Sequence, residues 1–443
     1  MKTKGLLIAT LVLAGLLATL YWSNHHPPSE QTAKASPNTA PKILTLKQDD
    51  ISGLDIKKEG GEVRLEKDAA GQWQITGPKT LPADQEAVSS LLSTLSSLDS
   101  VRLVDERPAD LKQYGLTKPR SEVAVTEKDK SQKLVVGDDT PSGNAVFAKL
   151  EADPRVFTLS SYTKAALDKS VNDLRDKRLL TADFDKVSQI EFVNQNGGKR
   201  LDFTLARSKD TWQILKPKPL RADAERVDEL IRALRDTKMD VSPAPDAGKA
   251  ASAFQSAQPF TSVTVTGASG VQELEVRKIR DTYFAKSSVV PGIYKVPAGV
   301  GTGLDKKLDD FANKRLFDFG YQDPDKIEIH DSSTSYFLTR SGSDWWGPEG
   351  KKLDDTNSEA LVSKLRDLSA TLFPEGGFTA PTLQITVTSD AGKRVERVSV
   401  AKKGDVYLAQ RENEATLYQL PSAAILQLRE AAGSIRPQET PKR

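Results

Sequence analysis

Residues 73–84 read Trp-Gln-Ile-Thr-Gly-Pro-Lys-Thr-Leu-Pro-Ala-Asp, and the pattern returns 139 residues later as Trp-Gln-Ile-Leu-Lys-Pro-Lys-Pro-Leu-Arg-Ala-Asp at residues 212–223. Each copy joins a run of strand-forming residues to an amphipathic segment, with prolines between them that interrupt the strand. The motif positions are Trp73, Pro78, Ala83 and Asp84 in the first copy, and Trp212, Pro217, Ala222 and Asp223 in the second. A third, less similar copy runs from Trp345 to Asp355. The recurrence predicts three tandem repeats.

A helix is expected after each copy of the motif. Asp84 and Asp223 are suitable N-caps, because a carboxylate can accept hydrogen bonds from the first free amides of a helix. Apolar residues then follow at the spacing of one helix face. They are Val88, Leu91, Leu92, Leu95 and Leu98 after the first copy, Val227, Leu230, Ile231 and Leu234 after the second, and Leu361, Leu365 and Leu368 after the third.

These patterns divide the chain into repeat one (43–180), repeat two (181–317) and a shorter repeat three (318–436), with a tail at 437–443 that we expect to be disordered. A length of 443 residues also fits three domains of about 150 residues each. Short strands of alternating polarity outnumber helices, and two helix patterns per repeat are too few for a doubly wound parallel sheet. The prediction is an α+β fold of mostly antiparallel sheets plus helices, preceded by one transmembrane helix.

The amino-terminal region has the composition of a membrane anchor and tether. A basic start at 1–4 is expected to stay cytoplasmic, and the uncharged, mostly apolar run at 5–22 is about 27 Å long as a helix, enough to cross a bilayer core. We interpret it as a signal anchor in the cytoplasmic (inner) membrane, with the bulk of the chain periplasmic or otherwise extracytoplasmic. A cleaved signal peptide and a secreted protein remain the alternative. The Pro-rich stretch at 23–42 is expected to be a linker.

Composition excludes several kinds of chemistry. The chain has no cysteine, which rules out disulfides and thiolate catalysis, and only three histidines. His25 and His26 lie in the linker, where a solvated pair is expected. A net charge of +2 argues against a nucleic-acid partner, which would select a basic face. We predict no cofactor, no metal site and no catalytic residue.

The tryptophans have two interpretations. They could line a ligand groove, but their fixed offset from the following helix favours packing of that helix against its own sheet. Trp346 is the candidate for an exposed contact, because adjacent residues on a strand face opposite sides and Trp345 occupies the motif position.

Three other stretches could suggest a functional site, but each has a simpler structural explanation. The glycines at 299–303 do not have the spacing of a phosphate-binding motif, so we expect a flexible loop. His330 and Asp331 would point to opposite faces of a strand and could not orient one another for catalysis. The matched stretches at 176–179 and 313–316 are expected to end the closing helices, with cations at the helix C-terminus.

The chain resembles the bacterial family catalogued as domain of unknown function 4340. The resemblance rests on the amino-terminal anchor, the Trp-x-Ile-x-x-Pro strand end, the Ala-Asp helix start, Tyr114-Gly115-Leu116 with Pro119, and Leu134-Val135-Val136-Gly137. It covers about 43–317 well and 318–436 less well. Repeat two departs from it, having Ala253-Phe254 where the Tyr-Gly-Leu would lie. The resemblance implies a membrane-anchored accessory to ABC-type transport components, like those of gliding-motility systems, and implies no catalytic residues.

Two functions therefore stand side by side. The first is a non-enzymatic envelope protein that assists an ABC-type assembly, contacting a permease, an ATPase or another envelope protein. The second is an envelope carbohydrate- or peptide-binding module, or a hydrolase, with a cleft of carboxylates and tryptophan. A concave cluster containing Trp346 and two close carboxylates would favour the second, and buried tryptophans would favour the first.

Overall fold

The computed structural model describes residues 42–438, apart from residues 129, 210, 242–246 and 333. The predicted anchor at 5–22, the linker with His25 and His26, and most of the tail lie outside the described residues. Among the helices that are described, none combines the length and the apolar character needed to cross a membrane.

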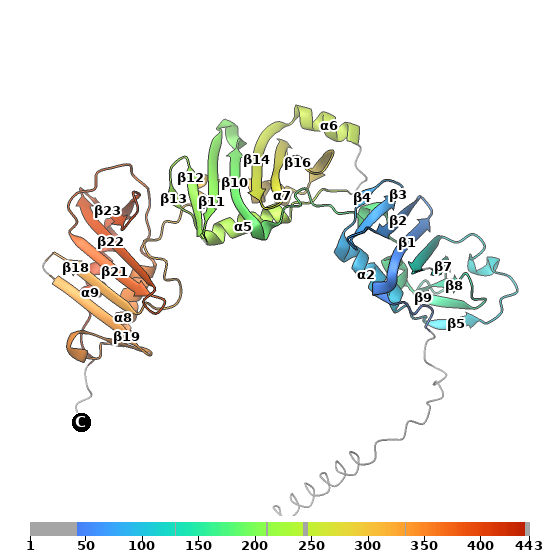
Figure 1. Ribbon diagram of the computed structural model, residues 1–443, viewed down its shortest axis with the longest axis horizontal. Coiled ribbons are helices and arrows are strands. Elements are labelled where there is room, and N and C mark those ends of the chain that lie inside the picture. The colour runs from blue at the N-terminus through green and yellow to red at the C-terminus, as the bar shows by residue number, and fades with distance from the viewer. Residues whose placement is uncertain (1–41, 129, 210, 242–246, 333, 439–443) are drawn as a thin grey trace, which may run out of the picture. The chain divides into compact units, whose positions relative to one another are not determined.

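The strands form three antiparallel sheets, one in each repeat (Figure 1). The first contains β1 (Ile51–Lys58), β2 (Gly61–Lys67), β3 (Trp73–Gly77), β4 (Leu81–Pro82), β5 (Arg102–Asp105), β6 (Ser121–Glu127), β7 (Lys130–Asp139), β8 (Ala145–Leu150) and β9 (Val156–Ser160). The second contains β10 (Val187–Asn194), β11 (Leu201–Ser208), β12 (Thr211–Lys216), β13 (Leu220–Arg221), β14 (Gln258–Gly267), β15 (Gly270–Ile279), β16 (Thr282–Ser287) and β17 (Ile293–Val296). The third contains β18 (Lys326–Asp331), β19 (Thr334–Ser341), β20 (Asp344–Trp346), β21 (Leu383–Ser389), β22 (Arg394–Lys403), β23 (Val406–Arg411) and β24 (Leu417–Pro421).

Eight α-helices accompany these sheets in the described part of the chain. They are α2 (Gln85–Ser96), α3 (Ser161–Leu167), α4 (Val171–Leu174), α5 (Ala224–Arg235), α6 (Ala247–Ser256), α7 (Ala298–Leu304), α8 (Asp355–Arg366) and α9 (Ser422–Gly433). The expected α+β class with antiparallel sheets is confirmed.

All three sheets follow one path. The first strand of each repeat is central, and the chain meanders from it to one edge, as in β10-β11-β12-β13. It then passes through the capped helix and returns to the other side of the first strand, where β14-β15-β16-β17 continues the sheet. Sheet one has the same order, with β5 added beyond β9, and sheet three follows it with one strand fewer.

The motif decides where each capped helix begins. The Asp84 carboxylate accepts from the amides of Glu86 and Ala87, and the Asp223 carboxylate accepts from Arg226. Asp354 caps α8 in the same way. The predicted apolar faces are buried, with Val88, Leu91, Leu92 and Leu95 in α2, Val227, Leu230, Ile231 and Leu234 in α5, and Leu361, Val362 and Leu365 in α8.

Each repeat has its own hydrophobic core, and each core contains its motif tryptophan. Trp73, Trp212 and Trp345 are 6%, 5% and 2% exposed. The core of repeat two begins at Leu179, and that of repeat three begins at Leu316. The tryptophans therefore pack helix against sheet in every repeat.

The stretches 176–179 and 313–316 are not helix ends, which corrects the expectation from sequence. Helix α4 already ends at Leu174, and Asn313 lies beyond α7. The amides of Asp176 and Asn313 donate to the carbonyls of Pro82 and Arg221 in the short edge strands β4 and β13. These residues are extended because they pair with strands, and backbone pairing rather than a helix dipole explains their recurrence.

Different segments pack on the corresponding face of the sheets in repeats one and two. In repeat one the Tyr114-Gly115-Leu116 segment crosses β7 at Gly137, where a Cβ atom would lie 2.1 Å from the Tyr114 carbonyl oxygen. In repeat two α6 takes this place, and Phe254 stacks on the Arg277 guanidinium at 4.5 Å. The family motifs around Tyr114 and Gly137 are thus two halves of one packing contact.

The glycine-rich stretch at 299–303 is also helical, not the flexible loop that its composition predicts. It forms most of α7, the counterpart of α3. A Cβ atom on Gly301 would lie 2.3 Å from the Tyr283 ring, so glycine is required for this helix to pack on the sheet.

The chain divides into two compact units between Asp176 and Lys177. The first unit contains the sheet of repeat one. The second contains the sheets of repeats two and three, and it holds the site described next.

Candidate functional site

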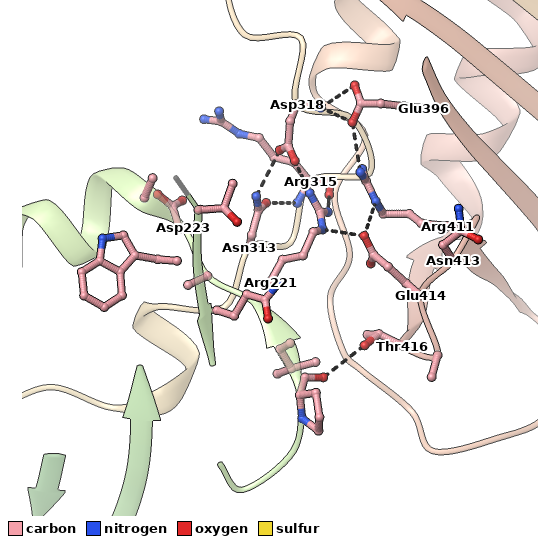
Figure 2. A pocket seen from close by; sticks show the side chains of 18 of the residues that line it. Arg221, Asp223, Asn313, Arg315, Asp318, Glu396, Arg411, Asn413, Glu414 and Thr416 are labelled. Atoms are coloured by element: carbon pink, nitrogen blue, oxygen red, sulfur yellow. Dashed lines mark hydrogen bonds and ion pairs between the residues drawn. The ribbon is translucent and has the colours of Figure 1, made fainter. Parts of the chain in front are cut away.

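A groove of about 1060 Å³ lies in the second unit (Figure 2). Its walls come from the edge strand β13 and the start of α5 in repeat two, the linking residues 313–318, and the β22 and β23–β24 region of repeat three. We call it the Arg221 groove, because Arg221 on its wall pairs with both Asp318 and Glu414.

Arg221 is the last residue of β13, and its side chain is only 17% exposed. Its guanidinium donates to the Asp318 carboxylate and to the Arg315 carbonyl oxygen. Its Nε lies 3.1 Å from the Tyr418 hydroxyl, to which it donates, and 3.3 Å from Glu414 Oε1. Strand β13 of repeat two is therefore held by side chains of repeat three and by the linking residues (Figure 2).

A second arginine, Arg411 of β23, extends this network. Its Nε lies 2.8 Å from Glu414 Oε1, and its Nη2 lies 3.1 Å from Glu396 Oε1. Glu396 is buried and accepts the Asp318 backbone amide with both carboxylate oxygens, at 3.0 and 3.1 Å. Arg411 also donates to the Leu316 carbonyl oxygen. The carboxylates of Asp318, Glu396 and Glu414 thus share two arginines.

The surroundings fix the ionisation of Arg221 and Tyr418. Burial lowers the pKa of Arg221, but the neighbouring Asp318 and Tyr418 outweigh burial and raise it above its ordinary value, so the guanidinium stays charged. Burial raises the pKa of Tyr418 to about 12 against the opposing effect of Arg221, so its hydroxyl stays neutral. Tyr418 can then accept from Arg221 while it donates to Glu414 Oε2 at 2.8 Å.

Two further contacts cross the groove. Lys218 Nζ donates to the Phe373 carbonyl oxygen at 2.7 Å, and Thr416 Oγ1 donates to the Pro219 carbonyl oxygen at 3.3 Å. A buried network of charges that bond one another holds two elements in register, and removing one member leaves the rest uncompensated. The arrangement suits a joint between repeats two and three.

The three carboxylates of this network are poorly suited to acid–base catalysis. Glycoside hydrolysis needs one carboxylic acid that can release a proton and one free carboxylate beside it. Asp318, Glu396 and Glu414 each accept from an arginine, and they also bond Asn313, a backbone amide and Tyr418, respectively.

The predicted motif residues occupy matched structural positions. Trp212, Ala222 and Asp223 lie on the wall of the groove, with Asp223 engaged as a helix cap. Their counterparts Trp73, Ala83 and Asp84 take the same places in repeat one. Pro78 and Pro217 both follow cis peptide bonds. Each set of motif residues packs within its own repeat, and only residues of the second set line the groove.

Trp346 is half-buried rather than exposed, and it does not line the groove. It lies opposite Thr339 in β19 and forms a bridge with Lys352. Its indole Nε1 is buried, which agrees with the lower exposure of the side chain. A contact role for Trp346 stays a prediction.

His330 and Asp331 point apart, as adjacent strand residues do. His330 Nδ1 lies 2.9 Å from Ser335 Oγ, whereas Asp331 accepts from Arg429 of α9 at 2.8 and 2.9 Å. Among the residues that the structure describes, no cluster of three or more His, Cys, Asp or Glu side chains could hold a metal ion.

Sequence reasoning missed the Arg221 network. Arg221 stands where repeat one has Pro82, and this departure from the repeat was the available signal. The partners Asp318, Glu396, Arg411 and Glu414 belong to no motif, so nothing in the pattern marks them.

The fold, the motif positions and the packing at Gly137 define a class of tandem α+β repeat proteins. The chain belongs to the family described as Domain of unknown function (DUF4340), which matches residues 73–211 and 212–392, more than half of its length. Each match begins at a motif tryptophan, so it runs from the third strand of one sheet toward the next sheet. No curated protein matches the chain.

Proposed function

We propose that this protein is a non-enzymatic, membrane-anchored extracytoplasmic protein that serves an ABC-type transport assembly through protein contacts. The observation that carries the proposal is that the central charged side chains of the Arg221 groove are already engaged with one another. Its central arginines and carboxylates bond one another, so the largest concave surface described above acts as a joint rather than as a set of free reactive groups.

The tryptophans support the same proposal. A tryptophan that stacks on a sugar or a peptide must expose its ring, yet Trp73, Trp212 and Trp345 are all buried in their cores. Trp346 is half-buried and away from the groove. A carboxylate and tryptophan cleft, the alternative function, would require these side chains to leave their packing.

The membrane and transport parts of the proposal rest on sequence. The apolar run at 5–22 has the length of a spanning helix, and the family resemblance implies ABC-type neighbours. Repeats held off the membrane by a Pro-rich linker are well placed to meet the extracytoplasmic loops of a permease.

The test is a pull-down from native membranes in mild detergent through a carboxy-terminal tag, with mass spectrometry of the recovered proteins. We expect ABC permease or ATPase subunits at near-stoichiometric levels. The matched control is residues 1–42 alone with the same tag, which should recover neither. A full chain that emerges as a clean monomer would overturn the proposal, and so would equal recovery by the control, since the anchor would then make the contact.

A further inference from the structure

A second cavity in the second unit, of about 900 Å³, lies at the end of sheet two where the β10–β11 loop meets β14 and β15. Four cationic residues line it, and no acidic residue does. They are Lys199, Arg200, Lys278 and Arg280, alongside Gly197, Gly198 and Phe260. Because the whole chain carries a net charge of only +2, this concentration of positive charge is local. We call this cavity the basic pocket.

The loop that forms the pocket is particular to repeat two. In repeat one the β1–β2 hairpin closes at the pair Lys58 and Gly61, and in repeat three the β18–β19 hairpin closes at Asp331 and Thr334. In repeat two the last pair is Asn194 and Leu201, which leaves residues 195–200 as a longer loop. These extra residues bring Gly197, Gly198, Lys199 and Arg200 to the pocket. The fold shared by the three repeats does not need them.

The longer loop is held in place by its own hydrogen bonds. Asn194, which is buried, donates to Asp305 Oδ1 at 3.0 Å and to the Lys306 carbonyl oxygen at 2.8 Å. Asn196 donates to Asp305 Oδ2 at 2.8 Å. The Gln195 amide donates to the Phe260 carbonyl oxygen at 2.9 Å. The pocket is therefore formed before any ligand arrives, which reduces the entropy lost on binding.

The cations are available to a ligand. Within the described residues, Lys199 and Arg280 are exposed and make no ion pair. Among the residues that the structure describes, Arg200 pairs with Asp202 alone, which lies outside the pocket. Both side chains are more than half exposed, so this pair is weak. The Lys278 ammonium lies 5.1 Å from the Tyr283 ring centre and 5.9 Å from that of Phe260, contacts that orient it and leave its charge uncancelled.

The matched end of repeat one is built differently, because three of its cations are paired. Lys58 bonds Asp168 at 2.6 Å, and Asp139 receives both Arg120 and Lys164, at 2.8 and 2.6 Å. Unpaired cations are thus no requirement of this end of the sheet, and in repeat two they call for another explanation.

We propose that the basic pocket binds a phosphate-bearing anion. Arginine and lysine are the side chains that recognise phosphate oxygens, and glycines in the loop let a bulky anion approach the backbone. A phosphate monoester carries a charge of about −1.5 to −2, so four cations can neutralise a ligand with two phosphate groups. The source is a soluble phosphate ester or the headgroup of an anionic lipid, and the pocket chemistry is shared. This inference does not depend on the proposed transport role.

The experiment uses the full chain in nanodiscs of phosphatidylcholine, with and without phosphatidylglycerol, and inorganic pyrophosphate as the soluble probe. Acylation of Lys199 and Lys278 is read by mass spectrometry, and pyrophosphate affinity is read by calorimetry. Protection of both lysines by pyrophosphate in either disc would identify a soluble ligand. Protection of both lysines in phosphatidylglycerol discs, with no protection by pyrophosphate in phosphatidylcholine discs, would identify a lipid headgroup.

The variants Lys199→Gln and Arg280→Gln should each weaken pyrophosphate binding about tenfold, the effect of losing one charged hydrogen bond. Lys393→Gln, which removes an exposed cation in repeat three, should leave it unchanged. Equal weakening in all three variants would overturn the proposal, because it would indicate nonspecific attraction. Absence of both protection and binding at millimolar pyrophosphate and in phosphatidylglycerol discs would overturn it as well.

Discussion

Pro82 in repeat one and Arg221 in repeat two occupy the same place in the same edge strand, and they have opposite consequences. The carbonyl of each accepts a backbone amide from the returning chain, Asp176 in one case and Asn313 in the other. Beyond the backbone they differ, because a proline ring offers no hydrogen bond whereas Arg221 bonds Asp318, Glu414 and Tyr418. Repeat one is a compact unit by itself, and repeats two and three form one unit.

The comparison teaches that the fold of each repeat and the contact between repeats two and three depend on different residues. The motif residues build each repeat, and side chains outside the shared motif positions, with Arg221 at their centre, attach repeat three to repeat two.

Replacing Arg221 should have the largest effect on the difference between repeats one and two. Arg221→Ala leaves Asp318 and Glu414 partly uncompensated in a buried site, so we expect a loss of about 3–5 kcal/mol in the unfolding free energy of the second unit. Urea unfolding followed by hydrogen exchange of peptides from 211–230 and 411–421 would measure it. Pro82→Ala in repeat one is the matched control, with an expected change below about 1 kcal/mol. Equal losses in the two variants would contradict the joint.

Alkaline pH should weaken the same joint through Tyr418. Its pKa is raised to about 12, from 10.0 in the unfolded chain, because burial disfavours the ionised form. The stabilisation by the neutral Tyr418 hydroxyl is therefore complete below pH 10 and is lost as pH rises toward 12, by about 3 kcal/mol in total. The measurement is unfolding free energy of the second unit against pH.

Tyr418→Phe should be less stable at neutral pH, since it removes a partner of Arg221, but its stability should fall less steeply between pH 10 and 12. Identical slopes for the two proteins would show that other groups cause the alkaline loss.

The strand ends offer a smaller test that sharpens the comparison between repeats. Lys58 pairs with Asp168 at the surface, whereas its counterpart Asn194 is buried and bonds Asp305 and a carbonyl. Lys58→Ala should cost below about 1 kcal/mol and Asn194→Ala about 1–3 kcal/mol, because only the second removes a buried side chain that makes three hydrogen bonds. Chemical denaturation resolved by unit would compare them, and a reversed order would refute this account.

The helix caps should show the smallest difference. Asp84 accepts from two amides at 3.1 Å each, and Asp223 accepts from one at 3.3 Å. We expect Asp84→Ala to cost about 1 kcal/mol and Asp223→Ala somewhat less. Hydrogen exchange at the first turns of α2 and α5 would detect both, and a greater effect at Asp223 would argue against hydrogen bonding as the source.

Sequence predicted the parts of this fold that repeat. Periodicity located the capped helices and the buried tryptophans, because helix faces and caps are encoded by residues close to one another. It failed for the glycine-rich α7, since the need for Gly301 arises from Tyr283 on a distant strand. The Arg221 network was out of reach for the same reason, because Arg221 and Glu414 are 193 positions apart and meet only in the folded chain.

Residues 313–316, at the start of the linking residues, have a consequence for any attempt to truncate the protein. Asn313 donates to repeat two, while the Leu316 amide donates to Leu368 and the Lys314 carbonyl accepts from Ala370 in repeat three. The same four residues thus belong to two hydrogen-bonded ladders. A fragment of repeat three that starts at 318 would lack the residues that bond Leu368 and Ala370, whereas a fragment that starts at 313 would keep them. The chain contains three repeats in sequence. No single cut between repeats two and three leaves both with all of their backbone hydrogen bonds.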